Sequence, residues 1–147
     1  MDLVKQLDQD LVEAMKAHEK VRLSVIREIK AGVKQAVIDQ KKEMNDELVI
    51  DVVSRGIKTR KESIKEFEKG NRKDLIEKTE EEIVILEKYL PKQLSKDEVL
   101  DIISEVFEKV KPEKASDMGK VMKELTPLLK GKADMKEVSE IIKNKLN

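Results

Sequence analysis

Apolar residues recur at helical spacing along almost the whole chain, with few residues to interrupt them. The 147 residues include only five glycines and three prolines, the two types that are least favourable inside a helix. Apolar side chains three or four positions apart lie on one face of an α-helix. With three aromatic residues in total, the core must be built from Val, Ile, Leu and Met. The pattern therefore predicts an all-α protein in which helices pack on one another.

Seven helices are expected, four in the first part of the chain and three in the second. The first four are indicated by apolar positions within residues 3–15, 25–37, 49–67 and 75–90. Asn45 is a predicted N-cap for the third helix, and the Gly-Asn pair at 70–71 is predicted to end it. The last three are expected around residues 99–110, around residues 118–129 and from Asp134 onward. Pro127 is predicted to kink the sixth helix or end it near residue 126, because proline lacks the backbone N–H.

The best internal boundary lies between residues 91 and 95. Pro91 ends the fourth helical pattern, because proline disfavours helical geometry in the residue before it. Ser95 and Glu98 form a predicted capping box, in which each side chain accepts a hydrogen bond from a free backbone N–H at a helix start. We therefore expect an N-terminal helical bundle, residues 1–91, followed by a small three-helix C-terminal domain, residues 92–147.

Charge and composition exclude several classes of protein. The 31 basic and 31 acidic residues cancel, so any nucleic-acid site has to be a local patch. Residues 1–91 hold 19 basic and 20 acidic side chains, net −1, whereas residues 111–147 hold 9 and 6, net +3. The absence of cysteine excludes disulfides and any thiolate nucleophile or cysteine-based metal site. No signal-like segment or apolar run of ~20 residues is found, so we expect a cytoplasmic protein with no membrane partner.

Two of the glycines stand beside lysines near the C-terminus, in the segments 117–122 (DMGKVM) and 130–134 (KGKAD). A helical projection at ~100° per residue places Lys120, Lys123 and Lys130 within an arc of about 80°. Gly119 falls beside them, away from the apolar face. Such a basic stripe can bind phosphates as point charges, and a glycine lets a ligand come close to the backbone.

Two structural alternatives stay open for this block. A lysine stripe opposite an apolar stripe is also typical of a solvated helix face. Gly131 is equally typical of a helix C-terminus, where Lys130 would favour the helix dipole. The candidate RNA-binding residues are Gly119, Lys120, Lys123, Lys130, Gly131 and Lys132.

Two arginines interrupt the apolar faces of their helices. Arg22 falls within the apolar arc of the second helix, and Arg60 lies on the apolar face of the third. We interpret each as a structural ion pair or as a snorkelling residue at the edge of the core. The alternative is a secondary anion-binding or partner-binding site formed by Arg22 and Arg60.

Four segments together resemble the YqeY family. They are the lysine–glycine block and residues 20–27 (KVRLSVIR), 54–63 (SRGIKTRKES) and 86–95 (LEKYLPKQLS). The C-terminal part also resembles the tail domain of the B subunit of bacterial tRNA amidotransferases. The chain departs from the family's pattern at Met135, where a glycine often stands. The resemblance implies a bacterial-type chain with an N-terminal bundle and a small C-terminal domain that touches tRNA.

No group of residues predicts catalysis. His18 is the only histidine and is expected in an exposed loop, while the carboxylates mostly follow the spacing of surface ion pairs. We therefore expect no catalytic residue, no metal and no cofactor. In an amidotransferase, the chemistry belongs to other subunits and domains, so the resemblance implies binding alone.

The expected function is therefore non-catalytic binding of tRNA or another structured RNA, with no DNA partner, beside an amidotransferase or an aminoacyl-tRNA synthetase. A protein–protein adaptor without RNA contact is the first alternative; its methionine-bearing C-terminal helices would dock a partner. An enzyme of unknown chemistry is the second, for which the family's label is carbon–nitrogen ligation with glutamine as amido donor.

Overall fold

The computed structural model describes residues 2–147, and in that range the chain is helical with no strand, which confirms the all-α prediction. The helices are α1 (Leu3–Lys16), α2 (Lys20–Gln40), α3 (Asp46–Lys69), α4 (Lys73–Glu87), α5 (Lys96–Val110), α6 (Met118–Leu129) and α7 (Met135–Leu146). A short 3-10 turn, η1 (Ala115–Asp117), precedes α6 and was not expected from the sequence. No helix in the described range combines the length and the apolar character that crossing a membrane requires.

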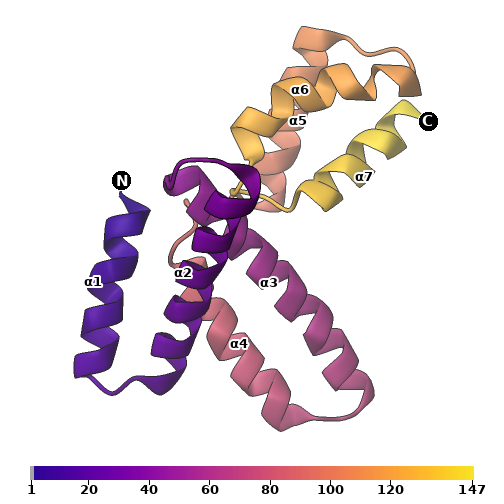
Figure 1. Cartoon of the computed structure of the whole chain (residues 1–147). Helices are drawn as coiled ribbons and strands as arrows, with labels where there is room; N and C mark the ends of the chain where they lie inside the picture. Colours follow the sequence, from indigo (N-terminus) through magenta and orange to yellow (C-terminus); the bar gives the residue numbers. More distant parts are fainter. Residues whose placement is uncertain (1) are drawn as a thin grey trace. The chain divides into compact units, whose positions relative to one another are not determined.

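The chain forms two compact units, one ending at Leu90 and the other spanning Pro91–Asn147. In the first unit, α3 and α4 form a long hairpin, and α2 packs against both of them (Figure 1). Helix α1 packs mainly on α2 and more lightly on α3. The core of this unit is aliphatic apart from Tyr89 and is centred on Val25, Ile26, Ile29, Val49, Val53 and Leu86. The division into an N-terminal bundle of residues 1–91 and a C-terminal domain of residues 92–147 stays a prediction.

The buried face of α1 differs from the expected one. In the predicted helix over residues 3–15, Leu3, Leu7, Leu11 and Met15 recur every four residues, yet Met15 is 51% exposed. Steps of four residues advance the helical angle by ~400°, so three such steps turn the side chain by about 120° away from Leu3. The positions buried with Leu3 and Leu7 are instead Asp10 and Ala14.

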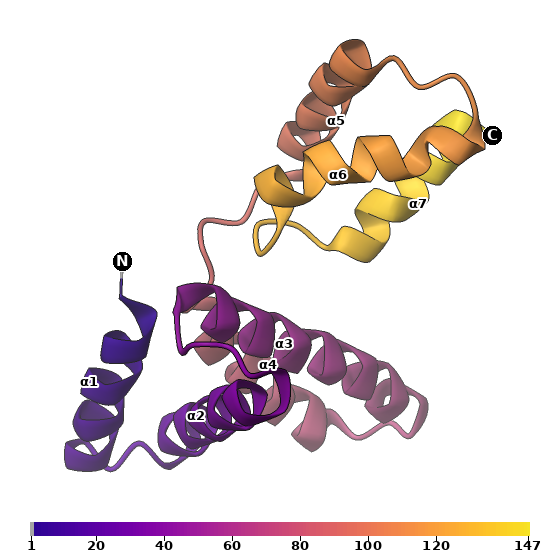
Figure 2. The same ribbon diagram turned by 45° about the horizontal axis from the view of Figure 1, so that its top comes forward.

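In the second unit, α6 packs against both α5 and α7 (Figure 2). Its fully buried residues are Val121, Leu125 and Leu129, which meet Ile103 of α5 and Ile142 of α7 in one core. Met118 and Met122 also pack against this core and are only partly exposed. The side chains of Met118 and Met122 therefore pack mainly within this unit.

The helix ends follow local chemistry closely. The Asn45 side chain accepts a hydrogen bond from the Leu48 N–H at 2.9 Å, which confirms the predicted N-cap of α3. Ser95 and Glu98 form the predicted capping box at the start of α5. At the end of α3, it is Asn71 that takes the left-handed conformation, with φ 55°, rather than Gly70.

Helix α6 does not end near residue 126. It continues through Pro127 to Leu129. The Thr126 hydroxyl donates to the carbonyl of Met122 at 2.7 Å, one turn earlier. The apolar residues on both sides of Pro127, Leu125 and Leu129, are fully buried. Core packing therefore outweighs the single backbone hydrogen bond that proline removes.

A non-helical segment opens the second unit. The Gln93 amide donates to the Gly131 carbonyl at 2.6 Å, and the Leu94 N–H donates to the Lys132 carbonyl at 2.9 Å. Both bonds join this segment to the turn between α6 and α7. The turn is therefore held from two sides, by the helices that flank it and by residues 93–94.

Candidate functional site

Four exposed lysines gather at α6 and the turn that follows it. Lys120 and Lys123 lie on the outer side of α6, while Lys130 caps the helix and Lys132 lies in the turn. We call Lys120, Lys123, Lys130 and Lys132 the C-terminal lysine surface. Lys120 and Lys123 lie within α6, Met118–Leu129, and keep the expected helical phasing. Lys130 is the C-cap, with ψ 125°, so it lies outside the helix and the projection that placed it in the same arc does not apply to it.

The two glycines of this block have different surroundings. A Cβ built on Gly119 would meet no atom within 4 Å outside its own helix and chain neighbours, so nothing in the fold requires a glycine there. Gly131 has φ 77°, a conformation that favours glycine, directly after the helix end. The helix-end interpretation therefore explains Gly131, whereas Gly119 leaves an open stretch of backbone beside Lys120.

The Asp117 side chain binds the backbone of the residues just before α6. Its carboxylate accepts hydrogen bonds from the N–H groups of Glu113 at 3.0 Å and Lys114 at 3.4 Å. These backbone donors, helped by the nearby Lys120 and Lys114 charges, hold the pKa of Asp117 below its ordinary value. The Lys120 ammonium lies 3.7 Å from the same carboxylate with its side chain 75% exposed. Lys120 is thus oriented near Asp117 but stays open to solvent.

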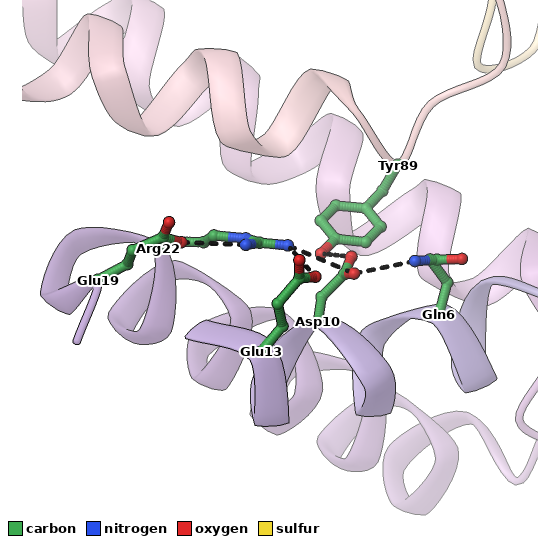
Figure 3. A network of polar contacts seen from close by, with 6 residues as sticks. All are labelled: Gln6, Asp10, Glu13, Glu19, Arg22 and Tyr89. Atoms are coloured by element: carbon green, nitrogen blue, oxygen red, sulfur yellow. Dashed lines mark hydrogen bonds and ion pairs between the residues drawn. The ribbon is translucent and has the colours of Figure 1, made fainter. Parts of the chain in front are cut away.

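Arg22 is surrounded by carboxylates in the first unit (Figure 3). Its guanidinium lies 3.0 Å from Glu19, 3.3 Å from Glu13 and 3.4 Å from Asp10. The hydrogen bond to Glu19, and then Glu13 and Asp10, raise the pKa of Arg22 against the opposing effect of burial. This geometry supports the structural ion-pair interpretation; an anion site at Arg22 stays a prediction.

The same group of side chains holds a buried acid that sequence analysis missed. Asp10 is 9% exposed and accepts hydrogen bonds from the Tyr89 hydroxyl at 2.5 Å and the Gln6 amide at 2.9 Å (Figure 3). Burial and the bond to Asp10 raise the pKa of Tyr89, so the phenol stays protonated and acts as a donor. The available signal was the position of Asp10 three residues after Leu7, on the buried face of α1.

Arg60 joins three helices. Its guanidinium pairs with Glu28 of α2 and lies 3.6 Å from Glu82 of α4, and it donates to the Gly56 carbonyl at 3.3 Å. Its Nε is buried without a hydrogen-bond partner among the described residues. Arg60 lines an open hollow of about 260 Å³ between α2, α3 and α4, together with Arg55. The pairs again support the structural interpretation, and the anion-site alternative for Arg60 stays a prediction.

His18 lies in the turn between α1 and α2, exposed and in the left-handed conformation with φ 57°. Within residues 2–147, no group of three or more His, Asp or Glu side chains is arranged to hold a metal ion. The C-terminal lysine surface presents ammonium groups to solvent, next to the open backbone at Gly119.

The chain is similar to known proteins over most of its length. The model of the family described as Yqey-like protein matches residues 4–146. The protein named "Altered inheritance of mitochondria protein 41, mitochondrial" of Lachancea thermotolerans is 42% identical over 91 residues, 61% of this chain and 49% of that protein. The protein of the same name from Candida glabrata is 32% identical over 126 residues, 84% of this chain and 69% of that protein. A third, from Pyrenophora tritici-repentis, is 29% identical over 144 residues, 95% of this chain and 78% of that protein.

The chain spans about half the length of the first of these curated relatives. The three relatives come from fungi, and their names refer to mitochondria. They give no support to the bacterial-type assignment that the resemblance implied. Their names state no ligand, partner or reaction.

Proposed function

The chain belongs to the YqeY family, and from that premise we propose that its C-terminal unit binds a structured RNA, with tRNA as the leading ligand. The ligand's phosphates would contact the C-terminal lysine surface. The observation that carries the proposal is the presence of four exposed lysines around α6 beside a glycine whose Cβ position is open space. The protein would perform no chemistry itself, and would act beside a tRNA-dependent amidotransferase or an aminoacyl-tRNA synthetase.

The physical basis is the interaction of ammonium groups with a polyanion. Lysine binds phosphate as a point charge, and neutralising phosphates releases counterions, so affinity falls steeply with salt. Such contacts position the protein on the nucleic acid but carry little sequence information. The absence of a Cβ at Gly119 would let the phosphate backbone approach α6 closely, and Gly131 would do the same in the turn.

The location of the protein belongs to the same proposal. A cytoplasmic location is what the sequence predicts, whereas the names of the relatives refer to mitochondria. A fractionation that tests both compartments therefore bears directly on which tRNA pool the protein can meet.

A salt titration with a charge-neutral variant tests the proposal. In the variant, all four lysines of the C-terminal lysine surface are replaced by Gln, which keeps the side-chain stem and removes the charge. A matched control replaces four other exposed lysines of the same unit, Lys96, Lys111, Lys136 and Lys143, by Gln. Binding of unfractionated tRNA is measured by anisotropy at several salt concentrations.

We expect the lysine-surface variant to bind more weakly, and the slope of log K against log salt to fall in magnitude by about 3. The control should stay close to wild type. Equal binding by the variant and the control across the titration would reject the assignment. Binding to a protein partner that persists at high salt, with no RNA binding, would instead favour the adaptor alternative.

A further inference from the structure

The outer face of α3 carries a second group of exposed basic side chains. Arg55, Lys58, Lys61 and Lys65 are all exposed, and none of the four side chains has a hydrogen bond or an ion pair among the described residues. At ~100° per residue they lie within an arc of about 120°, with one acidic residue, Glu62, among them. We call these four residues the α3 basic surface. Neighbours three or four positions apart are ~5–6 Å apart at their Cβ atoms, so the surface extends over about 15 Å of helix.

Basic side chains predominate on α3 from residue 55 onward, and acidic side chains predominate on α4. Residues 55–69 hold six basic and three acidic side chains, net +3, whereas α4 (Lys73–Glu87) holds two basic and six acidic, net −4. The helices are packed neighbours. Among the described residues, the ion pair recorded between them is Arg60–Glu82 at 3.6 Å. The α3 basic surface is therefore not neutralised by the acidic helix beside it, and apart from Glu62 it presents positive charge to solvent.

The side chains on this face of α3 indicate which class of anionic partner it can bind. A membrane-binding helix adds exposed apolar side chains beside its basic ones. No large hydrophobic residue of α3 is among the exposed ones; those of this unit are Val12, Met15, Ile38, Met44 and Val84. The α3 basic surface also has no aromatic residue on which an unpaired base could stack. What it can contact is the phosphate backbone of a double-helical nucleic acid, which proteins recognise mainly by shape and charge.

We propose that the α3 basic surface is a second phosphate-binding surface, which contacts the backbone of a double-helical region of a structured RNA. The proposal rests on the RNA-binding function proposed for the C-terminal unit, because it assigns the same class of ligand to the first unit. It extends that function to four residues outside the C-terminal lysine surface. The open hollow lined by Arg55, Thr59 and Arg60 lies at the edge of the surface and leaves the Arg55 side of α3 accessible.

Three full-length variants test the inference. The first replaces Arg55, Lys58, Lys61 and Lys65 by Gln. The matched control removes the same number of charges from exposed positions of the same unit that have no recorded ion pair, namely Lys16, Lys73, Lys78 and Lys88. The third replaces Lys58, Lys61 and Lys65 by Arg, which keeps every charge. Circular dichroism and thermal unfolding are used to check that each variant is folded.

The probes are unfractionated tRNA, a blunt RNA duplex, a single-stranded RNA of equal length, and vesicles containing phosphatidylserine. The Gln variant should lose at least roughly tenfold in affinity for tRNA and for the duplex at low salt, with a salt slope smaller by about 2–4. The control and the Arg variant should bind within about threefold of wild type, since neither loses the charges of this surface.

The outcomes separate this inference from the proposed function. If the Gln variant binds like the control while the C-terminal lysine variant loses affinity, the inference is wrong and the proposed function stands. If the Gln variant loses affinity and the C-terminal variant does not, the inference stands and the assignment of the C-terminal lysine surface is wrong. If wild type binds the vesicles or only the single strand, and neither tRNA nor the duplex, the inference is overturned.

Discussion

The buried hydrogen bond between Tyr89 and Asp10 should make a large contribution to the stability of the first unit. Tyr89 is 3% exposed and Asp10 is 9% exposed, and their oxygens are 2.5 Å apart. The bond joins residue 89, just after α4, to α1, which is otherwise attached mainly to α2. Replacing Tyr89 by Phe removes the hydroxyl and keeps the ring in the core.

A hydrogen bond to a charged group contributes ~1.5–3 kcal/mol. In the variant, Asp10 keeps the Gln6 amide at 2.9 Å and the Arg22 guanidinium at 3.4 Å, so it is not left without partners. We therefore expect Tyr89→Phe to lower the free energy of unfolding by about 2 kcal/mol. For a domain of 60–100 residues that corresponds to a fall in Tm of roughly 8–16 °C.

Urea unfolding followed by circular dichroism measures this change. Thr59→Val is a suitable control, because it also deletes a hydroxyl, but an exposed one that bonds the Arg55 carbonyl of its own helix. A loss of less than ~0.5 kcal/mol in Tyr89→Phe, equal to that of the control, would refute the argument, because exposed substitutions commonly fall in that range.

The pH dependence gives a second, independent measurement of the same bond. The pKa of Tyr89 is raised in the folded protein, mainly by burial and then by Asp10. The unfolded chain releases the phenolic proton near pH 10 and the folded chain only at higher pH. The contribution of this site to the free energy of unfolding is therefore at its full value below about pH 10. It decreases as pH rises above about 10, by at most ~1.4 kcal/mol per pH unit. The difference in stability between wild type and Tyr89→Phe should shrink accordingly.

Because Tyr89 is the single tyrosine and there is no tryptophan, its ionisation can be followed directly by the ultraviolet absorbance of tyrosinate. The titration midpoint should lie above ~10 in the folded protein and return to that value in concentrated urea. A folded-state midpoint near 10 would contradict the buried hydrogen bond.

Three further substitutions test packing and capping by thermal unfolding. Gly32→Ala should destabilise the protein by about 1–2 kcal/mol, because the new Cβ would lie 2.8 Å from the branched side chain of Val52. Gly119→Ala, whose Cβ enters open space, should be neutral or should stabilise by up to ~1 kcal/mol; equal effects of the two would contradict the packing argument. Ser95→Ala should cost ~1 kcal/mol by removing the cap on the Glu98 N–H, and an unchanged Tm would show that this cap contributes nothing.

Much of the fold could be predicted because its determinants are local. The Asn45 cap and the Ser95–Glu98 capping box depend on residues within three positions of one another. The continuation of α6 through Pro127 could not be predicted in this way, since it depends on burial of Leu129 against other helices. Local signals therefore located the helices, and tertiary packing decided one of their ends.

For the polar residues of the first unit, local sequence signals located the residues, and tertiary packing decided most of their partners. Sequence pattern identified Arg22 and Arg60 as misplaced on apolar faces, and Glu19, three residues before Arg22, is a local partner. Other partners come from distant positions, such as Glu82 for Arg60 and Asp10 for Arg22. The Asp10–Tyr89 bond joins residues 79 positions apart. No periodicity within one helix contains that information.

The short segment before α5 affects how the C-terminal unit can be isolated. Gln93 and Leu94 lie outside any helix, yet they donate hydrogen bonds to the carbonyls of Gly131 and Lys132. A fragment cut at the helix boundary, just before Ser95, would lose both donors. The turn that carries two of the four lysines would then be released on one side. A fragment meant to report the RNA affinity of this unit should therefore begin at Pro91 or earlier; weak binding by a shorter one would reflect a loosened turn.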